Sequence, residues 1–356
     1  MTRPSSRRTL TAAVTVVLLL VLVVVGSTVQ VPFVALGPGP TVNTLGTTPR
    51  ADSEVPVVEI GGATLDPVAG HLNLTTVSVS DGLTLFQAMG LWLSGTYSVQ
   101  PRETQFPSDQ TTDQTRQQNL RQMRDSESTA TAAALSYLHR PTQLVAAEVA
   151  EDGPAASVLN VGDVIVSVDG RPVTPTSVAL QQAVRAHQPG DRIVFGIRRG
   201  GQERSVTVTA QPRPGDAGVA YVGVTPEVRN ADPELTISYH VFDDQGHDIG
   251  GPSAGLMLSL AIVDRLSPGE LTHGRFVAGT GTVADDGVVG PIGGITHKTR
   301  AARDAGASVF LVPADNCAEA GTAVPDGLQL VKVTSLTSAI DALNALGAGR
   351  PVTGCS

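Results

Sequence analysis

An uncharged run near the N-terminus is the feature that most constrains how this chain can fold. No charged residue occurs from Thr9 to Leu36, and the stretch from Val14 to Val25 is almost wholly Val and Leu. A membrane crossing needs roughly 20 apolar residues, and a helix satisfies every backbone N–H and C=O group inside the lipid. The run therefore predicts a transmembrane signal anchor over residues 9–32.

Basic residues flank this run on one side only. Arg3, Arg7 and Arg8 precede it, and the next basic residue is Arg50. Because cytoplasmic flanks carry the excess of Lys and Arg, residues 1–8 are predicted to be cytoplasmic and the rest extracytoplasmic. A cleaved signal peptide is the alternative, but the run is long and no Ala-x-Ala site follows it, which favours an uncleaved anchor.

The remaining composition is that of a globular protein with room for two or so domains. The 356 residues are 41% hydrophobic and 16% charged, with a net charge of −9. No cluster of Lys and Arg with interleaved aromatic residues occurs, which argues against a nucleic-acid partner. The GxxxxGK[ST] motif of P-loop ATPases is also absent, and we expect neither a metal nor another cofactor.

Only two cysteines, Cys317 and Cys355, occur, and both lie beyond the predicted crossing. Disulfides persist in extracytoplasmic compartments. A bridge between the two would tie the C-terminal tail, residues 348–356, to the last domain, and the sequence leaves open whether that bridge forms.

The segment after the crossing alternates turns, strands and helices. Residues 36–40, Leu-Gly-Pro-Gly-Pro, are expected to be irregular. Strands are expected at 55–60 and 71–80, and an apolar helix at 83–93. A Gln-rich stretch that turns apolar over 113–138 predicts one long helix or two consecutive ones.

Residues 139–213 resemble a bacterial PDZ domain. Gly162-Asp163-Val164-Ile165 leads into a strand that ends at the hairpin turn Asp169-Gly170, and a helix is expected at 177–187. PDZ domains add an extended peptide as a strand beside a groove. The resemblance places the carboxylate-binding loop, and hence peptide-binding residues, at Tyr137, Leu138, His139 and Arg140. No glycine stands there, so a lid or spacer is the alternative role.

The chemistry is expected in the last domain, residues 216–347. A strand over 235–242 and a polar loop at 243–248 lead to Gly250-Gly251-Pro252-Ser253-Ala254-Gly255, and an apolar helix follows at 256–266. Ser253 should therefore lie at a helix N-terminus, where N–H groups and the helix dipole can stabilise an oxyanion. A serine in this position is otherwise an ordinary N-cap.

One of only two lysines follows this serine. Lys298 opens a helix of small residues after Gly293-Gly294, whereas Lys332 lies in a strand-like run and is expected on a solvated face. A serine in a glycine turn and a scarce lysine are the parts of a Ser-Lys nucleophilic dyad. The lysine must lose its proton to act as a base, and its Gly, Ala and Ile neighbours would lower its pKa by desolvation.

Four short motifs together resemble the proteolytic domain of Lon-type serine peptidases in their order and spacing. They are Pro252-Ser253-Ala254-Gly255, Thr280-Gly281-Thr282 with its flanks, Pro291-Ile292-Gly293-Gly294, and Lys298 followed by Ala301-Ala302. The resemblance implies that Ser253 is the nucleophile, Lys298 the general base and Thr280 the hydroxyl that orients the amine, with Gly251, Pro252 and Gly255 as supporting residues. Lon enzymes commonly carry an acidic residue where this chain has Gly250.

The resemblance extends upstream and covers nearly the whole chain. Gly70 to Leu74 and Met123 to Glu127 look like the first strand and helix of a Lon domain, so residues 55–138 would begin the peptidase fold and the PDZ-like module would be inserted in it. The expected fold class is α+β. An anchor, a PDZ-like module and a Ser-Lys domain without an ATPase are similar to the YlbL-like family of membrane-anchored bacterial proteases.

The sequence thus predicts an ATP-independent serine endopeptidase on the outer face of a bacterial cytoplasmic membrane. Without an unfoldase it would cleave unfolded or extended exported and membrane proteins, in quality control or regulatory processing. The Lon resemblance implies a homo-oligomeric ring. Two alternatives stay open: a catalytically silent PDZ-type scaffold, and a G-x-S-x-G α/β-hydrolase with His273 or His297 as its base.

Overall fold

The computed structural model describes residues 5–50, 53–242 and 246–355. The chain forms two compact units, Met1–Pro40 with Thr76–Gln118 and Thr41–Thr75 with Asn119–Ser356. Of the sequence-based predictions, part of the cytoplasmic N-terminus (residues 1–4) and part of the polar loop (residues 243–245) lie outside the described residues.

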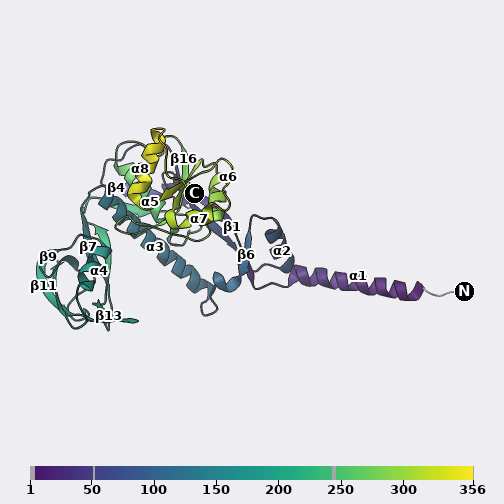
Figure 1. The fold of residues 1–356 in the computed structure, drawn as a ribbon, viewed down its shortest axis with the longest axis horizontal. Coiled ribbons are helices and arrows are strands. Elements are labelled where there is room, and N and C mark those ends of the chain that lie inside the picture. The colour runs from purple at the N-terminus through teal and green to yellow at the C-terminus, as the bar shows by residue number, and fades with distance from the viewer. Residues whose placement is uncertain (1–4, 51–52, 243–245, 356) are drawn as a thin grey trace. The chain divides into compact units, whose positions relative to one another are not determined.

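The first unit begins with the apolar helix α1, Ser5–Thr28 (Figure 1). Its segment Thr9–Thr28 has a mean hydropathy of 2.8 and is long enough to cross a membrane, a test that a signal sequence also passes. The helix ends at Thr28 rather than at the predicted residue 32. It ends there because the backbone turns into strand-like pairing, with a bridge between Gln30 and Thr84 and a bond from Val31 N to Leu83 O.

The composition of the Gly-Pro segment at residues 36–40 predicts an irregular structure. In the structure this segment lies instead within strand β1, Phe33–Asn43. The first four residues of β1 pair antiparallel with β6, Ser98–Pro101. Proline's fixed φ is compatible with extended backbone, and Gly37 is needed because a Cβ there would lie 2.2 Å from the Tyr97 ring.

The second unit contains a parallel sheet that carries the predicted peptidase segments. Strands β5 (His71–Ser80), β16 (Phe276–Gly279), β19 (Val309–Pro313) and β20 (Gln329–Val333) pair in this order, all parallel. Lys332 is exposed on β20. The helix α5, Gly255–Leu266, is buried on nearly all sides, so it forms the centre of the core.

Segments from both sides of the PDZ-like sequence build this one core. The strand β4 (Val58–Gly61) pairs with β15 (Thr236–Tyr239), and the second half of α3 (Thr112–Tyr137) contributes buried side chains to the cluster around α5. The two helices α6 (Ile295–Asp304) and α8 (Leu336–Gly347) follow later in the chain. The PDZ-like module therefore lies between two parts of a single fold.

The PDZ-like module is a sheet in the order β11-β10-β8-β7-β14, accompanied by helix α4, Ser177–Arg185. Its strands are β7 (Thr142–Val149), β8 (Val164–Val168), β10 (Arg192–Arg199), β11 (Gln202–Thr209) and β14 (Val224–Asn230), with the short strands β9 (Arg171–Pro172), β12 (Gln211–Arg213) and β13 (Asp216–Tyr221). The structure thus extends this module past the predicted end at residue 213, because β14 pairs with β7 along its whole length and Val228 joins the module's core.

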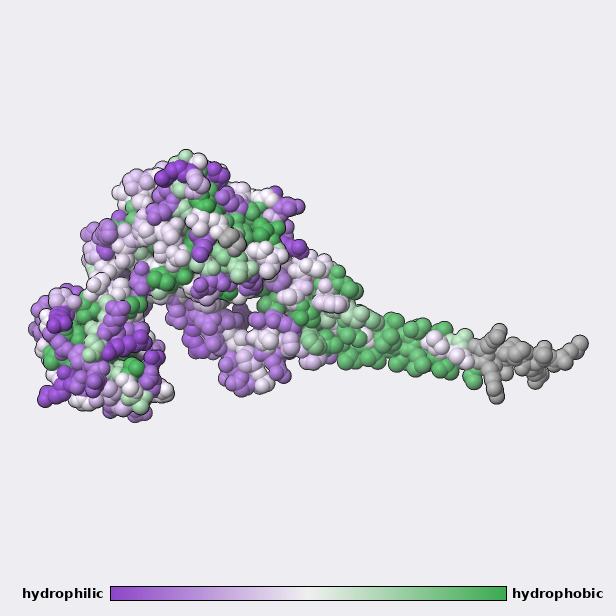
Figure 2. All heavy atoms as spheres, viewed as in Figure 1, coloured by the Kyte–Doolittle hydropathy of each residue, from purple (hydrophilic) through white to green (hydrophobic). Residues whose placement is uncertain are grey.

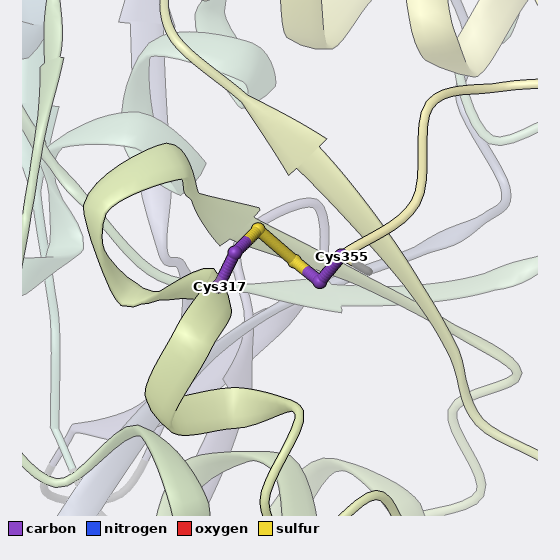
Figure 3. The surroundings of a disulfide bond; sticks show 2 residues. All are labelled: Cys317 and Cys355. Atoms are coloured by element: carbon purple, nitrogen blue, oxygen red, sulfur yellow. A yellow bond between two sulfur atoms is a disulfide. The ribbon is translucent and has the colours of Figure 1, made fainter.

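A disulfide joins Cys317, the first residue of α7 (Cys317–Ala320), to Cys355 in the C-terminal tail (Figure 3). The tail also pairs with the sheet edge, since Lys332 N donates to Thr353 O at 2.9 Å. The bridge that the sequence leaves open is therefore present, and it holds residues 348–355 against the last domain.

Candidate active site

Ser253 lies in the short 3-10 turn Pro252–Ala254, directly before helix α5. The turn begins at Gly251, whose φ of 101° favours glycine, and Gly251 N donates to Asn119 O on α3 at 2.9 Å. Gly250 is also required, because a Cβ there would lie 2.9 Å from the Cβ of Asn119. Helix α3 therefore excludes a side chain at the position where Lon enzymes commonly carry an acid.

Lys298 lies in the first turn of α6. The helix starts after Gly294, which has the left-handed φ of 69° and accepts the Lys298 N–H through its carbonyl. Nζ of Lys298 lies 2.7 Å from Oγ of Ser253 and 3.0 Å from Oγ1 of Thr280. The Lys298 amine therefore lies within hydrogen-bonding distance of both the Ser253 and the Thr280 hydroxyl.

Thr280, which follows strand β16, connects the lysine to the serine turn. Its hydroxyl donates to the Ser253 carbonyl at 3.1 Å, and the next residue, Gly281, donates its N–H to the same carbonyl at 3.0 Å. Because the Thr280 proton is directed to that carbonyl, the oxygen lone pairs remain for the Lys298 amine. Thr280 is fully buried, so water does not compete for these bonds.

Burial sets the charge of Lys298. Its side chain is 3% exposed, and desolvation lowers the pKa of Lys298 to about 7. Burial disfavours the ammonium form because the charge loses its hydration. A substantial fraction of the amine is therefore neutral near pH 7 and can accept a hydrogen bond from the Ser253 hydroxyl.

The other supporting residues shape the turn around Ser253. A Cβ at Gly255 would lie 2.9 Å from Val283 and 3.1 Å from Ser126 Oγ. The Pro252 carbonyl accepts a bond from Ser126 Oγ of α3 at 3.2 Å. Gly251 and Gly255 thus allow close approach of neighbouring elements, while Pro252 opens the turn.

Asn316 is a site-shaping residue that sequence reasoning missed. Its side-chain amide accepts from Ile292 N and donates to Ile292 O, both at 2.9 Å. These bonds fix the loop that leads into α6 and Lys298. Asn316 belongs to no motif and lies after Lys298 in the chain, so its only sequence signal is its place beside Cys317.

The structure does not bring the predicted peptide-binding residues to the PDZ groove. Tyr137 and Leu138 pack against the peptidase core, and Tyr137 and His139 line a cavity with Asp286 and Leu336. Arg140 N is bonded to Leu135 O at the end of α3. Residues 137–140 thus lie at the end of α3, before the first strand of the module.

A groove in the PDZ module instead lies between α4 and the segment β13–β14. It is lined by Leu180, Val184 and Arg185 of α4 and by Arg213, Tyr221, Val222 and Pro226, among others. Gly223, in the turn between β13 and β14, has a φ of 74°. Gly223 packs closely on Gly153, whose Cα would lie 3.1 Å from a Cβ at this position.

The geometry gives no support to a histidine base. A nucleophile elbow needs a strand immediately before the serine, and Ile249-Gly250-Gly251 are irregular. The ring of His273 lies against Gly347, where a Cβ would be 2.2 Å away. His297 adjoins Lys298 on α6, and adjacent helical residues do not face each other.

Comparisons with known proteins find two domain families along the chain. A PDZ domain family matches residues 116–210, and the Lon protease (S16) C-terminal proteolytic domain matches residues 218–345. The second match lies over the segment that holds Ser253, Thr280 and Lys298. The chain thus carries one segment that matches a PDZ domain and, after it, one that matches a Lon-type proteolytic domain.

Individual relatives match parts of the chain. Lon protease 2 of Bacillus subtilis (strain 168) is 27% identical over 142 residues, which cover 40% of this chain and 24% of that protein. A probable periplasmic serine endoprotease, DegP-like, of Pseudomonas fulva (strain 12-X) is 40% identical over 82 residues, which cover 23% and 17%. The chain thus spans a quarter or less of the length of these relatives.

Among solved structures, the PDZ domain of the SdrC-like protein from Listeria innocua is 21% identical. The match covers 24% of this chain and 92% of that one, with a TM-score of 0.22.

Proposed function

We propose that this protein is an ATP-independent serine endopeptidase that uses a Ser253–Lys298 dyad. The observation that carries the proposal is the 2.7 Å separation between Lys298 Nζ and Ser253 Oγ, in surroundings that lower the pKa of the lysine to about 7. A nucleophile in hydrogen-bonding distance of a base, with a third group that orients the base, is the arrangement of covalent catalysis.

In this mechanism Ser253 Oγ attacks the peptide carbonyl while Lys298 Nζ accepts the hydroxyl proton. The ammonium then gives that proton to the leaving amine, and an acyl-enzyme remains on Ser253. Water attacks the ester, Lys298 accepts a proton from the water, and returning it to Oγ regenerates the serine. The positive end of the α5 dipole lies beside the developing oxyanion, and Thr280 holds the amine in place.

We further propose that the substrates are unfolded or extended exported and membrane proteins. The chain carries no P-loop motif with which it could couple ATP hydrolysis to unfolding. The groove between α4 and β13–β14 would take an extended segment by strand addition, because β14 stands at the end of the PDZ sheet order. A homo-oligomeric ring is part of this proposal.

We also propose that α1 anchors the protein in a bacterial cytoplasmic membrane, with the N-terminus inside and the catalytic domain outside. Its 20-residue segment Thr9–Thr28 has the length and hydropathy of a crossing. Arg7 and Arg8 precede the run, and Arg50 is the next basic residue after it, which fits an N-terminus on the cytoplasmic side. The disulfide in the last domain fits an oxidising compartment.

The test is cleavage of casein by the full chain in detergent, without ATP, beside Ser253→Ala, Lys298→Met and Lys332→Met. The chain offers a matched control because Lys332, its only other lysine, is exposed on β20. Activity that the first two substitutions abolish and the third leaves unchanged would support the dyad. Activity that survives Lys298→Met would exclude it, and an assembled but inactive wild type would favour the peptide-binding scaffold.

A further inference from the structure

The helix α2, Leu85–Leu93, exposes apolar side chains that the proposed chemistry does not use. Five large residues, Leu85, Phe86, Met89, Trp92 and Leu93, are exposed, with Trp92 at 64% and Leu93 at 71%. Their spacing of i, i+1, i+4, i+7 and i+8 places them on one helix face. The opposite face is apolar too, because Ala88 and Leu91 pack into the small core around Ala35 and Leu83.

This exposed stripe lies beside the C-terminal end of α1, in the same compact unit. The Phe86 ring packs on α1 at Gly26, where a Cβ would lie 2.6 Å from Cε2 of the ring. Just after α1, Val31 N bonds to Leu83 O at 2.8 Å, directly before α2. Figure 2 shows the hydrophobic surface of α1 meeting further hydrophobic residues at this end.

The contact at Gly26 fixes the depth at which α2 would meet a bilayer. The segment Thr9–Thr28 has 20 residues, which span about 30 Å as a helix and match the hydrocarbon thickness. Gly26 stands two residues before the end of this segment, so Phe86 would lie about 3 Å inside the outer boundary. Tryptophan is enriched at this boundary, and Trp92 belongs to the exposed stripe.

We propose that α2 is a second membrane-contacting element, whose stripe Leu85, Phe86, Met89, Trp92 and Leu93 inserts into the outer leaflet of the membrane that α1 crosses. In this arrangement the exposed side chains of the stripe contact lipid at the boundary between headgroups and acyl chains. The inference rests on the membrane anchoring proposed above. A single crossing leaves the first unit free to tilt on the bilayer surface, whereas a second contact beside it holds that unit in one orientation.

The chain carries its own probe for this contact, because Trp92 is its only tryptophan. The full chain is reconstituted into phosphatidylethanolamine–phosphatidylglycerol vesicles, with or without lipids brominated near the headgroup end of the acyl chains. We expect brominated lipid to lower Trp92 emission about two-fold, since the indole would lie at the interface. We also expect protection from acrylamide in the aqueous phase.

Two variants provide the controls. Trp92→Phe combined with Val161→Trp moves the probe to an exposed position of the PDZ module, since Val161 is 67% exposed. That variant should be quenched by acrylamide and not by lipid. Met89→Glu combined with Leu93→Glu keeps Trp92 and should reduce its quenching by lipid, while flotation with the vesicles persists through α1.

The outcomes separate this inference from the anchoring it rests on. A chain that floats with vesicles while Trp92 stays as open to acrylamide as the Val161→Trp probe would overturn the contact and leave the α1 anchor standing. Protection of Trp92 from both quenchers would mean that protein, such as a second copy, covers the stripe, and would also overturn it. A chain that does not float would remove the anchor and the inference together.

Discussion

Burial of Lys298 affects stability as well as chemistry. Its pKa falls from the ordinary 10.5 to about 7 on folding, so between these two pH values the unfolded chain holds a proton here that the folded chain has lost. The free energy of unfolding therefore rises with pH across this window. Below about pH 7 both states are protonated, and this residue adds no further pH dependence.

The activity of the wild type should follow the neutral fraction of Lys298. We expect kcat/KM to rise with pH as a single titration centred at about pH 7 and then to level off, because only the free amine can accept the Ser253 proton. Initial rates on an unfolded substrate, measured over a pH series at constant ionic strength, check this. A midpoint near the ordinary lysine pKa would show that burial does not tune the base.

Removing the lysine charge should stabilise the fold at the expense of activity. Lys298→Met keeps an unbranched side chain without an ammonium, so the desolvation cost disappears. We expect the urea midpoint at pH 7 to increase relative to wild type, and the difference to shrink as the pH rises towards the unfolded pKa of 10.5, above which the wild-type lysine is neutral in both states. Lys332→Met, on the exposed edge of β20, should change neither midpoint.

At the scale of elements, the site depends on where α5, β16 and α6 begin and end. Ser253 precedes α5, Thr280 follows β16, and Lys298 opens α6. Each side chain therefore stands at the end of a rigid element, and a short loop determines its final position. The loop before α6 is held by Asn316 through two bonds to Ile292, so a turn that follows β19 helps to position the start of α6.

Asn316→Ala should loosen that loop. The variant leaves the Ile292 N–H and C=O without their side-chain partner, which costs about 1–3 kcal/mol when such groups are buried. We expect kcat to fall while KM changes little, because Lys298 would reach its catalytic position less often. Asn316→Asp keeps the acceptor for Ile292 N and should retain more activity than alanine. Equal kcat in all three proteins would contradict this role.

The disulfide next to Asn316 should contribute to stability. Cys317 and Cys355 close a loop with a sequence separation of 38 residues, and losing such a crosslink costs about 2–4 kcal/mol. Replacing both cysteines by serine should lower the free energy of unfolding by that amount in urea titrations. Reductant should shift the wild type toward the variant and leave the variant itself unchanged.

At the scale of the whole molecule, the peptidase fold is split by the PDZ module. The buried residues Leu72, Leu74 and Leu135 come before the module in the chain, yet they belong to the same core as α5. The ends of the module lie together, because Thr142 pairs with Asn230 and Ala231 N donates to Pro141 O at 3.0 Å. The module is therefore inserted into the peptidase fold at two positions of the chain that lie next to each other in space.

Two deletions test this arrangement. A fragment that starts at Pro214 lacks β5 and α3 and should not fold, since the buried side chains that these elements add to the core around α5 are then missing. A chain in which residues 142–230 are replaced by a short glycine-serine linker should keep a cooperative unfolding transition and the Ser253–Lys298 geometry. A Pro214 fragment that folds and cleaves casein would contradict the insertion.

The sequence determined the features that depend on contiguous residues. Three such features are the apolar run, the turn around Ser253 and the glycines before Lys298. Each is a local pattern, and it predicts the same local structure whatever the rest of the fold is. The structure differs from the sequence prediction where the conformation of a segment depends on pairing with a distant strand. Residues 36–40 are extended because β1 has partners, and β14 belongs to the PDZ module because it pairs with β7.

Only the tertiary structure decided the chemistry of the site. Ser253 and Lys298 are 45 residues apart in the chain, and it is the packing of α5, β16 and α6 that brings their side chains to 2.7 Å. Packing between distant elements also explains two other contacts. Asn119 leaves no room for an acidic side chain at position 250, and Asn316 hydrogen-bonds to Ile292. Contacts between residues far apart in sequence depend on how whole elements pack, and burial, which sets the pKa of Lys298, exists only once that packing has formed.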